Sequence, residues 1–431
     1  MPSHTIEIKD EDETVHFHYK DHEEEPCHYN EVVTLTNKWQ YNMSTEQFLR
    51  KIPKVELHVH LDGSFEPSLL FDHLRETGDY SCLPDQSYCP WDQSMLDVRT
   101  IVEKCETEDS FRALCTCRGK RSLNAMLENF TIFIPIVRGN LVLIENLAMD
   151  FVKRQAKQNC IYTEVRYSPH LLAEGGDIGG SGKVDPRPVV DAVTRGLREG
   201  EKLYGVKVNQ ILCCINWKPD WADDVVDIAH ERKDDFPCSI VGIDIAAGEE
   251  HFDEDNFSEL HNPHNKAFQR AQELGLNVTI HAGEVGDSKF VRKAVNEYGA
   301  TRIGHGYQIA KEPNLMEEMR RKNIHFELCP TSSDETGGWS YHDEESRDWM
   351  KHPAKAMLRY GLNCGFNSDD PAVFATSLTW QYRIAIGKIG LTKHCIVKAL
   401  QHSINSAFID DDTKAALRTR VEDFLENTDT F

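Results

Sequence analysis

The stretch Lys54-Val-Glu-Leu-His-Val-His-Leu-Asp62 decides the fold of this chain. Residues 55–60 form a short run of β-branched and apolar residues with charged neighbours, which is typical of a strand buried on both faces. His58 and His60 are two residues apart, so on a strand they point to the same face and can bind one ion together. The stretch therefore predicts a buried strand that carries a polar site at its carboxyl end.

Seven further runs of this kind occur along the chain, and each is followed by a helical pattern. Most intervals between their starts give the room that one strand, one helix and two loops need. This alternation predicts an α/β fold built as a (β/α)8 TIM barrel, and an open doubly wound sheet is the structural alternative. The eight predicted strands are residues 55–60, 161–166, 208–213, 240–245, 278–281, 302–305, 324–328 and 363–367.

The interval after the first predicted strand is the longest, so it must hold extra helices. Helical patterns occur there at residues 67–77, 98–112 and 123–130, and an insertion at the exit of a strand is expected to lie over the barrel mouth. Residues 1–50 are rich in acid and His, which indicates an acidic N-terminal extension, either flexible or draped on the core. Residues 51–431 are the predicted barrel domain.

The charge of the chain argues against polyanionic partners. Its 431 residues carry 48 Lys and Arg against 71 Asp and Glu, a formal net charge of −23, and such a surface repels nucleic acid and anionic lipid. We expect no transmembrane segment and no secretory signal, because long apolar runs are absent. The 13 Cys include no C-x-x-C pair, which suits reduced thiols. We therefore expect a cytoplasmic monomer.

Four of the predicted strands end in polar residues. Carboxyl ends of barrel strands surround one mouth, and buried His or Asp side chains are costly there unless they satisfy one another or bind a metal. Three imidazoles and a carboxylate suit zinc, with one position left for water. The alternatives are a hydrogen-bonded histidine pair and, at Asp369-Asp370-Pro371, a turn or helix cap. The predicted ligands of one zinc ion per chain are His58, His60, His281 and Asp369.

Three further polar residues follow the same strand ends. Glu284, three residues past His281, can reach the cavity as a proton donor, and His305 can hydrogen-bond the water that the metal activates. Asp370, beside Asp369, can hold the nucleophile or the leaving group. The predicted catalytic residues are therefore Glu284, His305 and Asp370.

Taken together, these residues resemble the adenosine deaminase family, from about residue 50 to the C-terminus and in the family's order. The motifs are highly specific in combination. They are Lys54-Val-Glu-Leu-His-Val-His-Leu-Asp-Gly-Ser64, His281-Ala-Gly-Glu-Val-Gly286, Gly304-His-Gly-Tyr307, Cys329-Pro-Thr-Ser-Ser333 and Ser368-Asp-Asp-Pro371.

The resemblance implies a zinc enzyme that hydrolyses adenosine and 2′-deoxyadenosine to inosine and 2′-deoxyinosine plus ammonia, in purine nucleoside catabolism and salvage. By that resemblance, Glu284 protonates the purine ring nitrogen beside the attacked carbon, His305 activates or orients the water, and Asp370 binds the new hydroxyl. Gly248 matches backbone that meets another ring nitrogen, and Asp62 matches the contact to the ribose 5′-hydroxyl. The other implied substrate contacts are His60 and an apolar lid, Leu123, Met126, Leu127 and Phe130, whose spacing alone would indicate core.

Asp62 carries an argument about the substrate. A carboxylate there accepts a hydrogen bond from a free 5′-hydroxyl but repels a 5′-phosphate, so a nucleoside is favoured over AMP. The enzymatic alternatives are deaminases of AMP, of N-methylated AMP or of free adenine. A binding or signalling protein that uses the fold without chemistry is disfavoured, because every predicted ligand and Glu284 are present.

Overall fold

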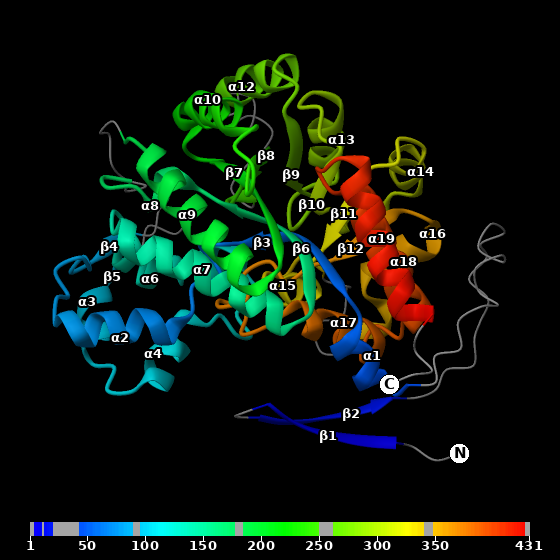
Figure 1. The fold of residues 1–431 in the computed structure, drawn as a ribbon, viewed down its shortest axis with the longest axis horizontal. Coiled ribbons are helices and arrows are strands. Elements are labelled where there is room, and N and C mark those ends of the chain that lie inside the picture. The colour runs from blue at the N-terminus through cyan, green and yellow to red at the C-terminus, as the bar shows by residue number, and fades with distance from the viewer. Residues whose placement is uncertain are drawn as a thin grey trace.

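Eight parallel strands form one sheet at the centre of the molecule, in the spatial order β12-β11-β10-β9-β8-β7-β6-β3 (Figure 1). The structure is a computed structural model that describes residues 4–10, 13–19, 43–88, 95–176, 184–249, 262–339 and 348–426. Each strand overlaps one of the predicted runs, so the predicted α/β barrel is confirmed. The strands are β3 (Lys54–His60), β6 (Cys160–Tyr167), β7 (Lys207–Ile215), β8 (Ile240–Ala246), β9 (Asn277–Ala282), β10 (Arg302–His305), β11 (His325–Leu328) and β12 (Asn363–Phe366).

Backbone contacts between the two ends of this sheet close it into a barrel. The chain leaving β12 pairs with β3, because Val59 and Asp369 form a parallel bridge. The amide of His60 donates to the carbonyl of Asp369 at 2.8 Å, and the amide of Asp369 donates to the carbonyl of His58 at 3.1 Å. An open doubly wound sheet would leave its first and last strands apart, so that alternative is wrong.

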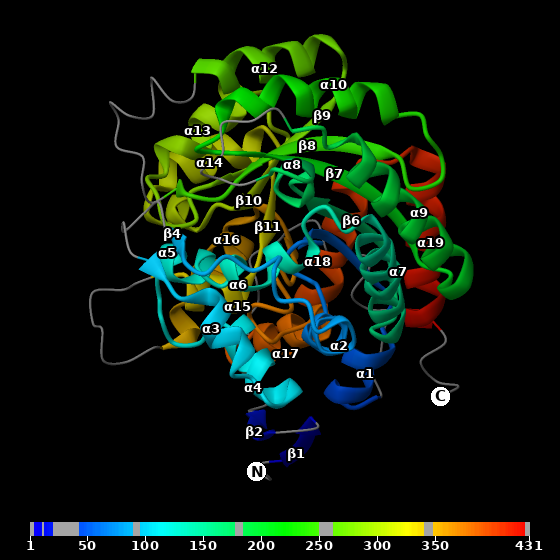
Figure 2. The same cartoon turned by 90° about the vertical axis from the view of Figure 1, so that its left-hand side faces the viewer.

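Helices surround the barrel and cover its outer face, as Figures 1 and 2 show. Their apolar stripes pack against the strands, which explains why the strands are buried on both faces. The covering helices are α7 (Leu141–Lys157), α9 (Arg187–Tyr204), α10 (Ala222–Arg232), α12 (Asn262–Glu273), α13 (Lys289–Asn296), α14 (Pro313–Arg321), α16 (Pro353–Tyr360), α17 (Leu378–Gly387), α18 (Lys393–Ser406) and α19 (Asp411–Glu426), and two short helices at strand exits are α8 (Pro169–Leu172) and α15 (Pro330–Glu335).

The segment between β3 and β6 forms a group of short helices and a small antiparallel pair of strands at one end of the barrel (Figure 2). The helix predicted at residues 67–77 is found with the same bounds, because Pro67 opens it and Gly78 ends it in a left-handed conformation. The predicted helices at 98–112 and 123–130 are each divided. The elements are α2 (Pro67–Thr77), β4 (Ser87–Tyr88), β5 (Met95–Leu96), α3 (Val98–Glu103), α4 (Glu108–Cys115), α5 (Leu123–Leu127) and α6 (Phe130–Val137).

Local hydrogen bonds account for both divisions. The first helix ends at Glu103, and Thr107 caps a new one, since its hydroxyl accepts from the amide of Ser110 in a capping box. Near Asn129 the helical bonds tighten to the three-residue kind, with the amide of Asn129 donating to Met126 and that of Ile132 donating to Asn129. Residues 98–112 and 123–130 are therefore not single helices.

The N-terminal part of the chain contains an antiparallel hairpin of β1 (His4–Asp10) and β2 (Glu13–Tyr19). Helix α1 (Thr45–Lys51) spans the boundary predicted at residue 50, and its Phe48 and Leu49 are fully buried. Arg383 of α17 pairs with Glu46 at 2.8 Å, so this helix is fixed to the barrel. Within the residues described, no helix is both long enough and apolar enough to cross a bilayer.

Candidate functional site

The four predicted metal ligands meet at the carboxyl ends of the strands. His58 and His60 lie on β3, His281 lies on β9, and Asp369 directly follows β12. One nitrogen or oxygen atom from each of the four lies within 4.8 Å of the others. His60 Nε2 is 3.1 Å from His281 Nε2, and His58 Nε2 is 3.0 Å from Asp369 Oδ1. The structure thus brings together residues that are more than 300 positions apart in the sequence.

The exit of β12 aims Asp369 at the histidines. Asp369 has a positive φ of 66°, a backbone conformation that is uncommon outside glycine and that concentrates at functional sites. Asn367 stabilises the neighbouring irregularity in β3, because its Oδ1 accepts from the amides of Leu57 at 2.9 Å and of His58 at 3.1 Å. The side-chain oxygen of Asn367 therefore holds the backbone of the first histidine ligand, a role that the sequence did not suggest.

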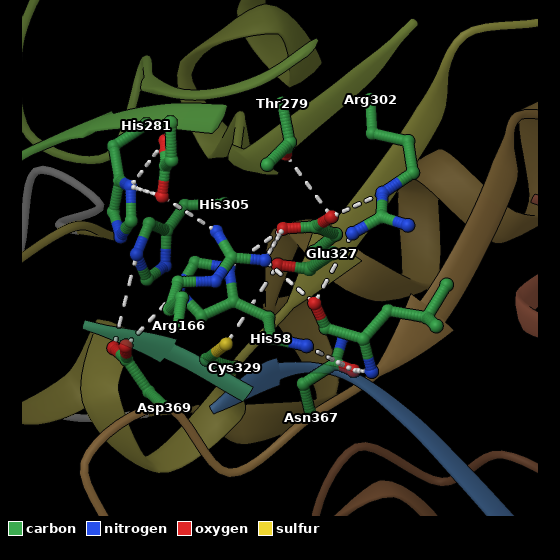
Figure 3. Close-up of polar contacts among 12 residues, drawn as sticks. His58, Arg166, Thr279, His281, Arg302, His305, Glu327, Cys329, Asn367 and Asp369 are labelled. Atoms are coloured by element: carbon green, nitrogen blue, oxygen red, sulfur yellow. Dashed lines mark hydrogen bonds and ion pairs between the residues drawn. The ribbon is translucent and has the colours of Figure 1, made fainter. Parts of the chain in front are cut away.

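Carboxylates behind the histidines fix which ring nitrogen faces the centre. His58 Nδ1 is 2.8 Å from Glu327 Oε2, and His281 Nδ1 is 3.0 Å from Asp244 Oδ2 (Figure 3). A carboxylate accepts only, so each Nδ1 donates and each Nε2 presents a lone pair to the centre. Carboxylate–histidine pairs of this kind orient imidazoles that bind metals.

The donor set fits a cation. With both outer nitrogens donating, the inward atoms are lone pairs and carboxylate oxygens, which repel one another at these distances unless a positive charge lies among them. Burial lowers the pKa of His60, but Asp370, Asp62 and Asp369 raise it to about 9, so this point in the cavity favours positive charge. Three nitrogens and one oxygen suit zinc. His305, Cys329 and Asp369 also lie close together, but burial raises the pKa of the Cys329 thiol well above its usual range, which disfavours a thiolate ligand.

A layer of buried charges lies beneath the histidines inside the barrel. Arg166 Nη1 is 2.8 Å from Asp244 Oδ2, and Arg166 Nη2 is 2.7 Å from Glu327 Oε2. Arg302 binds Glu327 Oε1 at 2.7 Å and Glu164 Oε2 at 2.5 Å. Figure 3 shows Arg166 and Glu327 between the histidines and Arg302. Sequence reasoning missed this layer, although charged residues within apolar strands, as in Ile161-Tyr-Thr-Glu-Val-Arg166, were a signal for it.

Glu284 and His305 lie next to the ligand cluster. His305 ends β10 with a positive φ of 65°, and its Nε2 is 3.7 Å from both Glu284 Oε2 and Asp369 Oδ2. Burial raises the pKa of Glu284 well above its usual range, and the carboxylates of Asp369 and Glu249 raise it further. Burial also holds the pKa of His305 well below its usual range. Burial therefore favours the protonated carboxyl group of Glu284 and the neutral imidazole of His305 in the same cavity.

These residues lie in a cavity of about 600 Å³, a size suited to a small organic ligand. Asp62 Oδ2 accepts from the amide of Ser168 at 3.0 Å. Asp62 Oδ1 and Asp370 Oδ1 are buried and have no hydrogen-bond partner among the residues described, so both can bind a ligand. Burial, and then the charge of Asp369, raise the pKa of Asp370 well above its usual range. The predicted site residues that line the cavity are His60, Asp62, His281, Glu284, His305, Asp369, Asp370, Leu123, Met126, Leu127 and Phe130.

The predicted contact Gly248 is not among the residues that line the cavity, but its neighbour Ala247 is. Gly248 has a φ of +82°, and a Cβ atom there would lie 2.2 Å from the indole of Trp217. Glycine is therefore required at this position for contact with Trp217 as well as for its backbone conformation. Trp217, which lines the cavity, is a residue that sequence reasoning missed. A single Trp after a strand gave no signal that could have identified it.

The chain is similar to known proteins over most of its length. The family model described as Adenosine deaminase matches residues 53–424, which include every site residue named above. Adenosine deaminase of Xenopus tropicalis is 35% identical over 377 residues, covering 85% of this chain and 93% of that protein. Adenosine deaminase of Bos taurus is 32% identical over 377 residues, covering 85% and 92%. The solved structure of an adenine deaminase from Arthrobacter aurescens has a TM-score of 0.69 at 21% identity and covers 87% of this chain and 99% of that chain, a likeness of fold.

Proposed function

This chain belongs to the adenosine deaminase family, and we propose that it catalyses the zinc-dependent hydrolytic deamination of adenosine and 2′-deoxyadenosine, as a step of purine nucleoside catabolism and salvage. The reaction takes up one water and gives inosine or 2′-deoxyinosine and ammonia. The observation that carries the proposal is the convergence of His58, His60, His281 and Asp369 beside Glu284 at the inner end of one cavity.

The same four residues would hold the metal, one ion per chain. Their three inward nitrogens and one carboxylate oxygen match the donor types that zinc takes in hydrolases. Zinc, when bound, supplies a Lewis acid that makes water nucleophilic at neutral pH. Glu327 and Asp244 keep His58 and His281 in the tautomers that this binding needs.

The remaining polar residues divide the proton transfers between them. Glu284, protonated because of its burial, donates a proton to the purine ring nitrogen beside the carbon that water attacks. His305, neutral for the same reason, accepts a proton at Nε2 from the attacking water. Asp370, through its free Oδ1, binds the hydroxyl group that forms. The amino group takes up the proton that His305 accepted and leaves as ammonia, and the proton of the new hydroxyl returns to Glu284 as the product carbonyl forms.

Asp62 favours a nucleoside over a nucleotide. Its Oδ1, which lies 3.7 Å from His60 Nδ1 and makes no shorter polar contact among the residues described, can accept a hydrogen bond from the ribose 5′-hydroxyl. The buried carboxylate of Asp62 would repel a 5′-phosphate. The lid residues Leu123, Met126 and Phe130 would cover the base, since purine faces bind to apolar side chains.

The test is the change in ultraviolet absorbance when zinc-quantified protein is mixed with adenosine, 2′-deoxyadenosine, AMP or adenine. We expect loss of the adenosine band with about one zinc per chain, and turnover of AMP and adenine at least about 100-fold slower, because each lacks or violates the contact of Asp62. Asp62→Asn should reduce the difference in turnover rate between adenosine and AMP. Faster turnover of AMP or adenine than of adenosine by the wild type would overturn the substrate assignment.

A further inference from the structure

One carboxylate accepts hydrogen bonds from four successive backbone amides of the loop that carries Glu284. Glu249 Oε1 accepts from the amide of Gly283 at 2.5 Å. Glu249 Oε2 accepts from the amides of Glu284 at 2.9 Å, Val285 at 3.1 Å and Gly286 at 3.1 Å. None of these four hydrogen bonds involves a predicted metal ligand, and Glu249 is only 8% exposed.

Four amides turned toward one carboxyl group form a concave anion-binding arrangement. Burial raises the pKa of Glu249, and the four backbone amides oppose that shift. The loop has room for this carboxylate only because residue 286 is glycine. A Cβ atom at Gly286 would lie 2.7 Å from Glu249 Cγ and 2.8 Å from Glu249 Cδ. Glu249 and Gly286, which are distant in sequence, are thus complementary in shape and in hydrogen bonding.

Glu249 is itself attached to a fixed point of the barrel. The amide of Asn216 donates to Ala246 at 3.1 Å, and Asn216 Nδ2 donates to the carbonyl of Ala247 at 2.5 Å. Trp217 packs against Gly248, the residue before Glu249. Asn216 and Trp217 therefore hold the backbone of residues 246–248, directly before Glu249, and the carboxylate connects this backbone to the loop after β9.

We propose that Glu249 is a positioning residue that holds the loop Gly283–Gly286, and through it the carboxyl group of Glu284, at the place where the proton is donated. The proposal rests on the proposed function for the role of Glu284. A displacement of about 1 Å at a catalytic group can cost about 100-fold in rate, so loss of this anchor should lower kcat far more than it changes KM.

Two substitutions disrupt the contact from opposite sides. Glu249→Ala removes the acceptor, and Gly286→Ala puts a methyl group where the carboxylate lies. We expect kcat to fall about 100-fold in each, with KM within about threefold and zinc content unchanged. Glu249→Gln keeps one acceptor oxygen and should recover part of the rate. The double variant should lose little more than the worse single variant, because both changes break the same contact.

A control removes a carboxylate from the same loop without touching the four amides. Asp287 is exposed, and its Oδ1 accepts from the amide of Lys289 at 2.8 Å. Asp287→Asn should leave kcat near that of the wild type. Hydrogen exchange of the amides at 283–286, measured on zinc-loaded protein without substrate, should accelerate in Glu249→Ala and Gly286→Ala and stay unchanged in Asp287→Asn.

The outcomes separate the two proposals. Faster local exchange together with reduced kcat supports the anchoring role. Unchanged exchange at 283–286, or unchanged kcat in folded Glu249→Gln and Gly286→Ala, would overturn it. If the wild type turned over no aminopurine while the exchange effect was present, the proposed function would fail and the anchor would stand as a property of the loop. If Glu249→Ala did not fold, the Gln and Gly286 variants would still decide the question.

Discussion

The mouth of the barrel and the charge layer beneath it are built from the same residue types but satisfy them differently. In the charge layer, Glu327 accepts from Arg166, Arg302, Thr279 and His58, so both of its oxygens are used. At the mouth, Asp62 Oδ1, Asp370 Oδ1 and His305 Nδ1 are buried without a hydrogen-bond partner among the residues described. A few residues separate these layers along the strands.

The difference shows which layer serves stability and which serves binding. A buried polar group without a partner costs about 1–3 kcal/mol, so such groups are candidates for ligand binding where they line a cavity. Arg166 Nε in the charge layer is also unpartnered among the residues described, but Arg166 does not line the cavity. Complete pairing, as at Glu327, orients side chains and leaves no unpaired oxygen that could bind a ligand. The lower layer thus holds the ligand histidines in place, and the upper layer presents the unsatisfied atoms to metal and substrate.

The largest effect should come from the mouth, where two substitutions separate metal binding from proton transfer. His281→Ala removes a ligand, so we expect loss of zinc and of turnover together. Glu284→Gln keeps the four ligands but cannot supply the proton, so kcat should fall about 10²- to 10⁴-fold with zinc retained. Zinc content by mass spectrometry and kcat with adenosine measure the two effects.

Neither substitution should lower the free energy of unfolding of the metal-free protein much, because the mouth contributes little to stability. Glu284→Gln with near-normal kcat would contradict the role of Glu284 as proton donor. Zinc retained at one ion per chain in His281→Ala would contradict the ligand set. Removal of zinc from the wild type with a chelator gives the reference state for both.

The next largest effect should come from the charge layer, where a substitution should lower stability and leave turnover nearly unchanged. Arg302→Met removes the cation that pairs with Glu164 Oε2 and Glu327 Oε1 inside the barrel, so the free energy of unfolding should fall by about 3–5 kcal/mol. Turnover per zinc-loaded molecule should stay close to that of the wild type. Denaturant unfolding and kcat measure the two.

A surface ion pair serves as the control for this change. Arg320 pairs with Glu317 at 2.8 Å on an exposed helix face, and Arg320→Met should cost only about 0–1 kcal/mol. Equal losses of stability in Arg302→Met and Arg320→Met would show that the charge layer is not a stabilising element. A large loss of kcat with unchanged unfolding in Arg302→Met would move the layer into the catalytic machinery.

The barrel strands could be predicted because each is an apolar run whose end is marked by polar residues, and β10 (Arg302–His305) was predicted with its observed bounds. The residues that meet at the mouth could be predicted because the carboxyl ends of barrel strands converge. The charge layer could not, since Arg302 meets Glu164 across 138 residues and no local pattern specifies that pairing. The same holds for Glu249, which meets Glu284 across 35 residues by hydrogen bonds to backbone alone.

The smallest effect concerns Lys54, a buried cation that lacks the pairing of the charge layer. Its Nζ donates to the carbonyls of Gln158 at 2.7 Å and Ile52 at 3.1 Å, and burial lowers its pKa to about 7. The pKa in the unfolded chain is about 10.4, so between these values the unfolded state binds the extra proton and stability rises with pH. Between pH 7 and pH 9, the free energy of unfolding of the wild type, measured in urea, should therefore rise by about 2 kcal/mol relative to that of Lys54→Met. The exposed Lys207 is the control, and Lys207→Met should show the same pH dependence as the wild type. A wild type that loses stability relative to Lys54→Met over that range would mean that Lys54 is charged and paired like the arginines above it.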